Sequence, residues 1–322
     1  MSVILLIAEI IFIGGLIVGL YQKNTNLVCK SKKRLDGKTV IVTGGTSGMG
    51  LEIATDFAHR GAKVIVACPY EDEGYNGKKK IIKSSGNENV IFKLLDLSSL
   101  ASIRTFAADI LQNEDRLDIL VNNAGLSTAG NRITEDGMNL VMQVNYFGPF
   151  LLTILLLPLL KKTGDSDEPS RIVNTASVLH RVGRVNFKSW NNSKMSVFAY
   201  ANSKLCVVLF TRELAERIKN SNVVVNVVDP GAVGTSIFLT VVGKGFGSFV
   251  SFLFFVLFKQ PWEGAQTAIY AAMSQSAGKH TGQLYKNCKI ARPSATCYDD
   301  KLARNLWEES VRLVKLNNEE YI

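Results

Sequence analysis

Six short runs rich in β-branched residues alternate with longer helical patterns, and this alternation restricts the possible folds more than any other feature. The runs are continuously hydrophobic, as expected for strands buried on both faces. Alternating strands and helices imply right-handed crossovers. We therefore predict one α/β domain built on a doubly wound parallel sheet, with a long apolar helix over 135–162 and strands at 38–43, 63–67, 89–95, 118–123, 171–176 and 223–228.

The N-terminus predicts a membrane anchor. Residues 3–21 are apolar apart from Glu9, and about 20 such residues span a hydrocarbon core. Basic residues follow this stretch but do not precede it, which places the rest of the chain in the cytosol. A cleaved signal peptide would need a basic start and a small-residue cleavage site, and both are missing. We expect a transmembrane helix and basic linker over 1–34, a catalytic domain over 35–322, and the endoplasmic reticulum as the membrane.

Charge and cysteine usage exclude several other classes of function. The formal net charge of +9 would suit nucleic acid or an anionic membrane surface, but the sequence contains no nucleic-acid-binding motif. The five cysteines are odd in number and lack paired metal-type spacing, and only three histidines are present. This pattern fits a reducing compartment. We expect no metal site and no nucleic-acid partner, and the sequence leaves the oligomeric state open.

A glycine-rich segment predicts a phosphate site. The sequence TGGTSGMG, Thr43–Gly50, directly follows the first strand and leads into a helix, where backbone amides can approach a pyrophosphate. No lysine follows the glycines as in a P-loop, and Ile53 stands where a GxGxxG motif has its third glycine. Tight packing of strand on helix is the alternative. Asn122–Gly125 and Asp229–Thr235 follow two further strands, so all three segments meet at one sheet edge.

A tyrosine and a lysine lie four residues apart in a mostly apolar helix. Tyr200 and Lys204 therefore share one helical face. A nearby ammonium favours the phenolate and makes tyrosine a usable acid–base group. The alternative is a surface lysine beside a packed tyrosine. Ser177 follows the fifth strand and Asn145 lies in the preceding helix, so both are expected at the same edge.

Together these motifs resemble the short-chain dehydrogenase/reductase family, over nearly everything from residue 36 onward. TGGTSGMG is similar to its TGxxxGxG pattern, NNAG to its fourth-strand motif, YANSK to YxxxK and PGAVGT to PGxVxT. Within the family the chain resembles the membrane-anchored retinol dehydrogenase branch and its X-linked dehydrogenase/reductase relatives. The segments NVVDPGAVGTSI, EGAQTAIYAA and LARNLWEES carry that closer likeness. The resemblance implies a single Rossmann-type domain.

The resemblance also implies residue roles. Tyr200 would exchange a proton with the substrate oxygen, and Ser177 would hold that oxygen. Lys204 would hold the nicotinamide ribose and lower the pKa of Tyr200, while Asn145 would keep a water in a relay to solvent. The residues expected at the cofactor are Gly44, Thr46, Ser47, Gly48, Met49, Gly50, Asp96, Leu97, Asn122, Asn123, Ala124, Gly125, Tyr200, Lys204, Pro230, Gly231 and Thr235.

The residues that would choose between NAD and NADP are non-committal. In the family that the chain resembles, an acidic residue at the position of Cys68 implies NAD, and a basic one at Pro69 or Ser47 implies NADP. Here all three are uncharged. Either cofactor, or both, fits. Lys78–Lys80 are assigned to a solvated helix. His180 is expected to shape the pocket rather than act as the acid–base group, since Tyr200 fills that role.

The substrate is expected to be apolar. Residues 245–258 contain six phenylalanines and no charge, and 14 residues are short for a membrane span. An inner core helix is one possibility, but we favour an apolar flap near 236–260 that rests in the bilayer interface. The predicted function is NAD(P)-dependent interconversion of a hydrophobic alcohol and its aldehyde or ketone at a membrane. Retinoids come first and polyprenoids next, and steroids or fatty aldehydes also fit. The alternative is a catalytically weak, membrane-tethered cofactor-binding scaffold.

Overall fold

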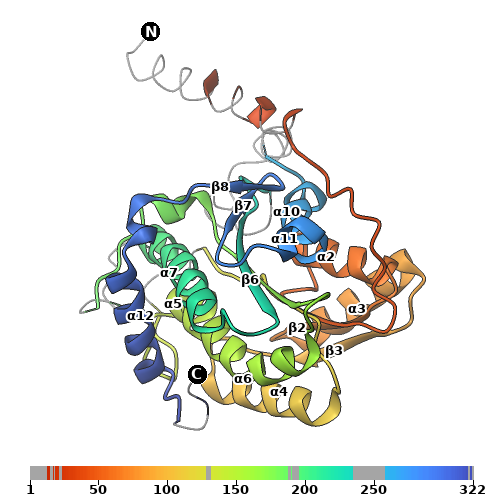
Figure 1. The fold of residues 1–322 in the computed structure, drawn as a ribbon, viewed down its shortest axis with the longest axis horizontal. Coiled ribbons are helices and arrows are strands. Elements are labelled where there is room, and N and C mark those ends of the chain that lie inside the picture. Colours follow the sequence, from red (N-terminus) through yellow and green to blue (C-terminus); the bar gives the residue numbers. More distant parts are fainter. Residues whose placement is uncertain are drawn as a thin grey trace.

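A single parallel sheet with one antiparallel edge strand forms the centre of the protein (Figure 1). The computed structural model describes residues 13–14, 17, 19–21, 24–127, 132–187, 190, 196–234, 258–317 and 320. Within these residues the strand order is β3-β2-β1-β4-β5-β6-β7-β8, and only the β7–β8 pair is antiparallel. The strands are β1 (Thr39–Thr43), β2 (Lys63–Cys68), β3 (Val90–Leu94), β4 (Ile119–Asn122), β5 (Ser170–Thr175), β6 (Val223–Asp229), β7 (Leu284–Lys286) and β8 (Lys289–Ala291).

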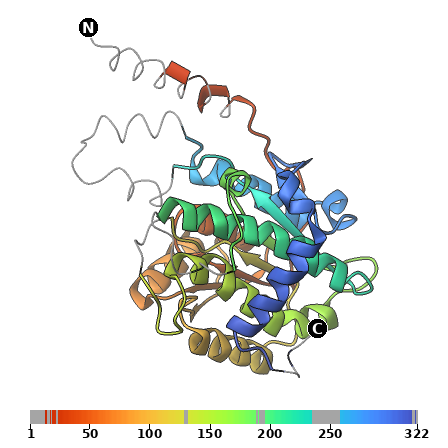
Figure 2. The ribbon, with the colours of Figure 1, turned by 90° about the vertical axis from the view of Figure 1, so that its left-hand side faces the viewer.

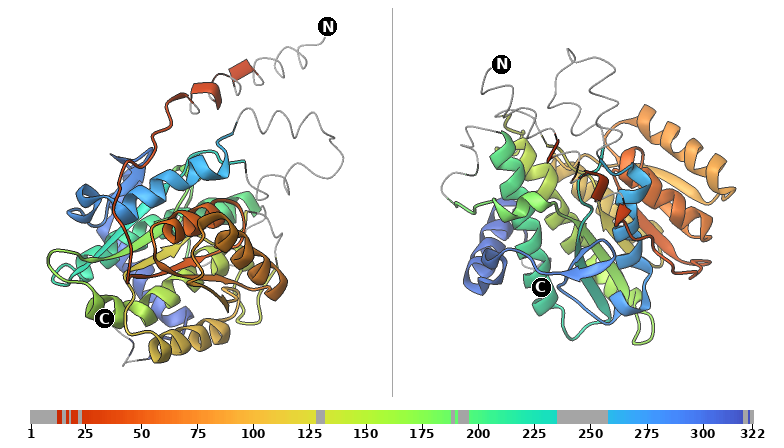
Figure 3. Two further views of the ribbon diagram at one scale, coloured as in Figure 1. Left: turned by 90° about the vertical axis from the view of Figure 1, so that its right-hand side faces the viewer. Right: turned by 90° about the horizontal axis from the view of Figure 1, so that it is seen from above.

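Helices cover both faces of the sheet because successive strand side chains point to opposite sides. In β1, Ile41 enters one hydrophobic cluster, whereas Val40 and Val42 enter the other. The helices of the first face are α4 (Leu100–Asn113), α5 (Leu140–Met142), α6 (Gly148–Thr163), α7 (Ser196–Arg217) and α12 (Asp300–Leu313). Those of the second are α2 (Gly48–His59), α3 (Glu71–Ser85), α10 (Pro261–Met273) and α11 (Gln275–Gly278) (Figure 3).

The C-terminal helix α12 closes the first layer from outside, lying across α7 in Figure 2. Its Trp307 is fully buried, with ring centroids 5.1 Å from Phe150 and 6.0 Å from Phe210. The guanidinium of Arg217 in α7 lies 4.2 Å from the Trp307 ring centroid. Large aromatic surfaces of this kind dominate core energetics, so α12 is an integral part of the domain.

All six predicted strands are confirmed, with each end within one residue of its expected position. The last two strands, β7 and β8, were not predicted, because each is only three residues long. Their two-residue turn places Asn287 and Cys288 at φ 50° and 55°. Turns of this kind usually carry glycine, and the sequence has no such signal there.

The long apolar helix starts later than predicted and is interrupted. It begins at Leu140, and the Asn139 side chain caps it by accepting hydrogen bonds from the backbone amides of Val141 and Met142. A π-helical turn, Gln143–Phe147, then separates α5 from α6. Among the described residues, Leu140–Thr163 is the one stretch long and apolar enough to cross a membrane, yet 83% of its apolar window is buried inside the domain. It is therefore a core helix.

The predicted transmembrane helix falls largely outside the described residues. Those described between 13 and 21 are helical, and Ile17 and Tyr21 are exposed. The following segment, predicted as a basic linker, lies against the domain. We call residues 24–34 the strap. Its backbone and side chains are hydrogen-bonded to α2, α10 and the β7–β8 turn, which explains why it is not a loose connection.

Candidate active site

The carboxyl ends of the parallel strands form one edge of the sheet, called here the carboxyl edge. The chain passes from β1 outward to β3, then returns to β4 on the other side of β1. Ligands of doubly wound sheets bind where the strand order reverses in this way, beyond the carboxyl ends. The sequence motifs after β1, β4, β5 and β6 all lie along this edge.

The glycine-rich turn after β1 has a backbone that only glycine can supply at two positions. Gly44 has φ +63°, a left-handed conformation. A Cβ on Gly50 would lie 2.1 Å from the Gly44 oxygen and 2.5 Å from Asn123 Nδ2. Ser47 is the exposed N-cap of α2, and its hydroxyl makes no capping hydrogen bond. The turn thus leaves backbone amides and a hydroxyl at the positive end of a 12-residue helix, where an anion is stabilised.

Two residues of this turn are packed beneath it rather than exposed. Thr46 and Met49 are both buried. Helix α3 lies directly behind the turn, so that a Cβ on Gly77 would come 2.8 Å from Thr46 Cα. The segment is therefore closely packed against its surroundings, in line with the alternative of tight packing, and the phosphate site stays a prediction.

Asn123 fixes β4 against the glycine-rich turn. Its Nδ2 donates to the Thr43 oxygen at 3.1 Å and to the Gly44 oxygen at 3.5 Å. Its backbone amide and that of Ala124 both donate to Thr43 Oγ1, at 3.0 and 3.1 Å. These bonds join the ends of the two strands that flank the point where strand order reverses.

Asn122 serves a different purpose from its neighbour. Its Nδ2 donates to Asn174 Oδ1 at 2.8 Å and to Thr153 Oγ1 at 2.9 Å, which links β4 to β5 and α6. Asn174 Nδ2 in turn donates to Thr211 Oγ1 of α7 at 3.0 Å. This buried chain of amides, expected only in part, ties α7 to the sheet. A buried polar group without a hydrogen-bond partner is costly. A shifted register of β4 against β5 would break these bonds, so they favour the observed register.

Helix α7 presents Tyr200 and Lys204 together at the carboxyl edge. Lys204 is buried, its Nζ donates to the Thr175 oxygen at 2.8 Å, and it lies 5.6 Å from the Tyr200 ring centroid. The Ser177 side chain lies near enough to the Tyr200 phenol to lower its pKa. Ser177 lies two residues beyond β5 and is the N-cap of a short 3₁₀ turn. The structure therefore brings these three predicted residues together.

The electrostatics of this group differ from the expectation that Lys204 lowers the pKa of Tyr200. Burial raises the pKa of Tyr200, the hydrogen bond from Ser177 offsets part of this rise, and the Asp229 carboxylate adds to it. Burial also lowers the pKa of Lys204 to about 8. Desolvation, which disfavours the charged form of either group, thus acts on both members of the pair.

Asn145 lies within the π-helical turn, a type of distortion that often marks functional positions. Its Oδ1 accepts from the Leu126 amide at 2.7 Å, and its Nδ2 donates to the Leu126 oxygen at 2.8 Å and to Ser203 Oγ at 3.0 Å. A Cβ built on Gly125 would lie 3.3 Å from Asn145 Oδ1 and 3.6 Å from Lys204 Nζ. Asn145 and Lys204 therefore flank the same glycine.

A small internal cavity adjoins this group. It offers about 10 Å³ to a water centre and is lined by residues that include Asn122, Asn145 and Thr175. Asn122 Oδ1 and Thr175 Oγ1 are buried without a hydrogen-bond partner among the described residues. A polar space of about 10–15 Å³ holds one water molecule. The cavity thus has the size and the unpaired oxygens for one water next to Asn145.

His180 contacts two separate segments through its two ring nitrogens. It is buried, its Nδ1 lies 2.7 Å from the Ser177 oxygen, and its Nε2 accepts from the Ser294 amide at 3.4 Å. Burial lowers the pKa of His180, which favours the neutral ring. With Nδ1 donating and Nε2 accepting, the imidazole joins the loop after β5 to the segment that precedes α12.

The remaining predicted cofactor residues lie at the same edge or outside the described chain. Asp96 follows β3 and accepts from the Ser98 amide at 2.8 Å, while Leu97 is buried beside it. Gly231, after Pro230, has φ +81°, and its amide donates to Asp229 Oδ1 at 3.0 Å. Thr235 lies outside the described residues.

The residues expected to distinguish the two dinucleotides sit at the end of β2. Cys68 is buried and its Sγ donates to the Tyr70 oxygen at 3.2 Å, whereas Pro69 is exposed. Lys79 and Lys80 are exposed on α3, as expected for a solvated helix. Neither the buried thiol nor the exposed proline carries charge that would favour one dinucleotide.

Sequence reasoning missed the residues that hold the site in place. Asn174, Thr211 and Ser203 carry no motif of their own. The only available signal was polarity at a position that should be apolar, such as Asn174 inside the strand RIVNTA. Within the described part of the chain, no group of three or more His, Cys, Asp or Glu side chains could hold a metal ion.

Comparisons with known proteins agree with this arrangement. Residues 38–242 match the family model for short chain dehydrogenases. Among curated relatives, "Dehydrogenase/reductase SDR family member 13" of Bos taurus is 39% identical over 96% of this chain and 83% of that protein. "Retinol dehydrogenase 13" of Homo sapiens is 39% identical over 94% and 92%.

Solved structures show the same likeness. The active-site complex of Pseudomonas aeruginosa RhlG with NADP has a TM-score of 0.64 and 27% identity, over 79% of this chain and 95% of that one. The 3-ketoacyl-(acyl-carrier-protein) reductase of Brucella melitensis, complexed with NADH, has a TM-score of 0.62 and 25% identity, over 78% and 97%. The two structures hold different nicotinamide dinucleotides.

Proposed function

The chain belongs to the short-chain dehydrogenase family, and from this premise we propose that it interconverts a hydrophobic alcohol and its aldehyde or ketone with NAD or NADP. The observation that carries the proposal is the meeting of Tyr200, Ser177 and Lys204 at the carboxyl edge. Retinoids are the first substrate class to test, because curated relatives are named retinol dehydrogenases.

The described residues fit a nicotinamide dinucleotide. The space that a Cβ on Gly50 would fill, the free Ser47 hydroxyl and the N-terminus of α2 suit its pyrophosphate. The glycine at 125, flanked by Asn145 and Lys204, leaves room at the other end of the edge. When bound, the nicotinamide accepts or supplies the hydride, and the protein contributes placement and electrostatics.

The side chains around Tyr200 would move the proton. In alcohol oxidation, the Tyr200 phenolate oxygen takes the hydroxyl proton of the substrate, and in carbonyl reduction the phenol returns it. Ser177 holds the substrate oxygen and stabilises the phenolate by its hydrogen bond. Lys204, close to Tyr200 and to the cavity that suits one water, supplies positive charge beside the phenolate. Asn145 would retain that water on a route to solvent.

Membrane delivery of the substrate is part of the proposal. The apolar residues 3–21 support an anchor, and the six phenylalanines of 245–258 support an apolar surface near the site. Residues 245–257 lie outside the described chain. Polyprenols, steroids and fatty aldehydes are the next substrates to compare, because each joins an alcohol or carbonyl to a large apolar body.

The test compares membranes that carry the wild type, Tyr200→Phe or the control Tyr75→Phe. Tyr75 is exposed on α3, away from the proton-transfer group. Retinol, retinal and a polyprenol are offered in turn, each with the oxidised or reduced form of NAD and NADP. We expect Tyr200→Phe to lose about 10²–10⁴-fold in turnover because its acid–base group is gone, while dinucleotide binding and the Tyr75 control stay unchanged.

The outcomes separate the candidate functions. Turnover that survives in Tyr200→Phe would show that another group moves the proton. Dinucleotide binding without turnover of any offered substrate would favour the membrane-tethered scaffold or a different apolar substrate. The substrate and dinucleotide pair with the highest kcat/KM would identify both at once.

A further inference from the structure

Exposed apolar side chains gather at the carboxyl edge. Each follows the carboxyl end of a strand or opens a helix that starts there. Two aromatic rings stand out: Phe198 in the first turn of α7, 53% exposed, and Trp262 in the first turn of α10, 44% exposed. They belong to opposite faces of the sheet. The others at this edge are Tyr70, Leu94, Ile133, Val178 and Val182, whereas the opposite, amino edge has Leu111 among the described residues.

The strap delivers the N-terminal chain to this same edge. Strand β1 starts at the amino edge, so a direct entry would leave the N-terminus there. Instead the strap runs the whole length of α10 (Figure 3, left). Asn26 Oδ1 accepts from Lys259 Nζ at 2.6 Å just before α10 begins, and the Cys29 amide donates to Gln266 Oε1 at 3.0 Å midway. Ser31 Oγ donates to the oxygen of Met273, the last residue of α10, at 3.5 Å.

The strap and α10 have nearly the same length where they lie side by side. From Asn26 to Ser31 an extended chain rises about 17 Å, at roughly 3.3 Å per residue. Helix α10 rises about 15 Å between Glu263 and Met273, at roughly 1.5 Å per residue. Asn26 Nδ2 also donates to the Glu263 oxygen at 3.5 Å, so the two segments keep step at both ends. The strap is therefore a fixed spacer rather than a tether.

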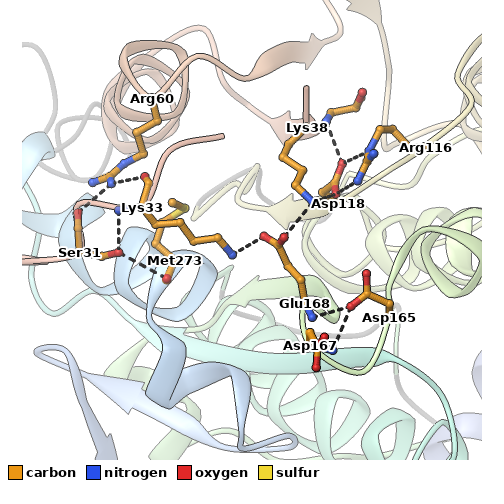
Figure 4. A network of polar contacts seen from close by, with 11 residues as sticks. Ser31, Lys33, Lys38, Arg60, Arg116, Asp118, Asp165, Asp167, Glu168 and Met273 are labelled. Atoms are coloured by element: carbon orange, nitrogen blue, oxygen red, sulfur yellow. Dashed lines mark hydrogen bonds and ion pairs between the residues drawn. The ribbon is translucent and has the colours of Figure 1, made fainter. Parts of the chain in front are cut away.

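Both ends of the strap are clamped. At the carboxyl edge, Asn287 Oδ1 accepts from the Leu27 amide at 2.7 Å and its Nδ2 donates to the Thr25 oxygen at 2.5 Å. Figure 4 shows the other end, where Lys33 and Lys38 both pair with Glu168. The pKa of Glu168 is lowered to about 2, chiefly by the hydrogen bond from Lys33 and further by that from Lys38.

A third cation, Arg60, also holds the strap at this second end. Arg60, the C-cap of α2, donates from one nitrogen to the Ser31 and Lys33 oxygens, at 2.8 and 2.9 Å (Figure 4). Its other nitrogens pair with Asp56 in α2. The strap thus has a defined direction relative to the sheet.

We propose that the carboxyl edge is the face that the domain lays against a lipid bilayer, with Trp262 and Phe198 at the level of the headgroups. The inference rests on the membrane-bound function proposed above. From Tyr21 to Asn26 the chain reaches at most about 18 Å, so an anchor over 3–21 would hold this edge close to the membrane surface. Aromatic rings are favoured at that level. An apolar substrate could then pass from lipid to Tyr200 without crossing water.

Tryptophan fluorescence tests the surface directly. The chain has three tryptophans, of which Trp307 is buried and Trp262 is exposed. The full-length protein is reconstituted in phosphatidylcholine vesicles with brominated acyl chains, and the signal of Trp262 is taken as the difference between wild type and Trp262→Phe. We expect roughly half or more of that signal to be quenched. As a matched control, Tyr298→Trp in the Trp262→Phe protein places a reporter at a position on another face that is 46% exposed, and it should stay unquenched.

Three results would overturn the proposal. Trp262 could escape quenching, or the reporter at position 298 could be quenched as strongly. A second copy of the chain could cover the edge instead, which would appear as concentration-dependent shielding of Trp262 from acrylamide without lipid. None of these measurements needs turnover. Quenching without Tyr200-dependent turnover would refute the proposed function alone, and turnover without quenching would refute the surface alone.

A separate experiment tests whether the strap sets the orientation of the domain on the membrane. The double variant Asn26→Ala with Asn287→Ala removes the side-chain hydrogen bonds at the carboxyl-edge end of the strap but leaves residues 3–21 intact. We expect it to remain bound to vesicles while the quenching of Trp262 falls at least twofold. Asn113→Ala, at the end of α4 on the amino edge, is the matched control and should keep full quenching. Unchanged quenching in the double variant would show that the strap does not set the orientation.

Discussion

At the scale of single residues, burial is the first cause of the pKa shifts of Tyr200 and Lys204. Tyr200 and Lys204 were expected from their spacing to interact mainly as phenol and ammonium. In the structure, desolvation raises the pKa of Tyr200 and lowers that of Lys204. The spacing of two residues shows that they share a helical face. It cannot show how deeply the two side chains are buried, and burial is what raises the pKa of Tyr200 rather than lowering it.

The first prediction concerns Lys204. Its pKa of about 8 in the folded protein lies below the 10.5 of a free lysine. The unfolded chain therefore binds more protons between these values, and the free energy of unfolding rises with pH across them. Relative to Lys204→Met, the wild type should gain roughly 2 kcal/mol between pH 7.5 and 9.5.

Urea unfolding of the two proteins without dinucleotide, at several pH values, measures this gain. Other titrating groups are common to both proteins and cancel in the difference. A difference that stays constant with pH would mean that Lys204 keeps an ordinary pKa in the folded state.

At the scale of elements, the glycine-rich turn and the start of α2 are closely packed. Gly50→Ala would force the Gly44 carbonyl away from its position, because the new Cβ would lie 2.1 Å from that oxygen. Overpacking of this kind costs about 1–3 kcal/mol in stability. We expect the variant to bind NAD and NADP at least tenfold more weakly, as measured by titration calorimetry.

Gly86→Ala is the matched control for that loss. Gly86 has φ +70° with nothing near its Cβ position, and it ends α3 away from the turn. The substitution strains the backbone by about 1–2 kcal/mol, so stability should fall while dinucleotide affinity stays. Equal affinity in Gly50→Ala would show that the turn can relax.

The long strands were easier to predict than the turns and short strands that depend on distant contacts. The hydrophobic runs of β1 to β6 are long enough to show burial on both faces, so their ends are correct to one residue. The π-helical turn at Asn145 depends on contacts with Leu126, a residue distant along the chain, and no local pattern signals it. The three-residue strands β7 and β8 likewise depend on long-range pairing, β7 with β6 and β8 with β7. Motif residues were predictable, and their supports, such as Asn174, were not.

At the scale of the whole molecule, the strap makes the N-terminal segment part of the domain. The linker expected over 22–34 contacts α2, α10 and the β7–β8 turn. The sequence could not show that Asn26 and the backbone of this segment find partners far along the chain.

Truncation tests that integration. Removing residues 1–23 leaves the strap and should leave the unfolding temperature unchanged. Removing residues 1–34 deletes its hydrogen bonds, each worth about 1 kcal/mol before the cost of ordering the chain. We expect a net loss on the order of 2 kcal/mol, which lowers Tm by a few °C. Thermal unfolding of both detergent-solubilised proteins measures this, and equal Tm values would show that the strap adds no stability.

One small feature bears on how such a protein can change over time. Val233 and Lys259 form a parallel bridge, with the Gly234 amide donating to the Lys259 oxygen and the Lys259 amide to the Ala232 oxygen, both at 2.9 Å. The bridge closes the base of the intervening insertion on the main chain alone. Backbone bonds do not depend on which side chains the chain carries between the two bridged residues. The bridge would therefore tolerate a change of sequence in that stretch, while the elements that hold Tyr200 and Lys204 keep theirs.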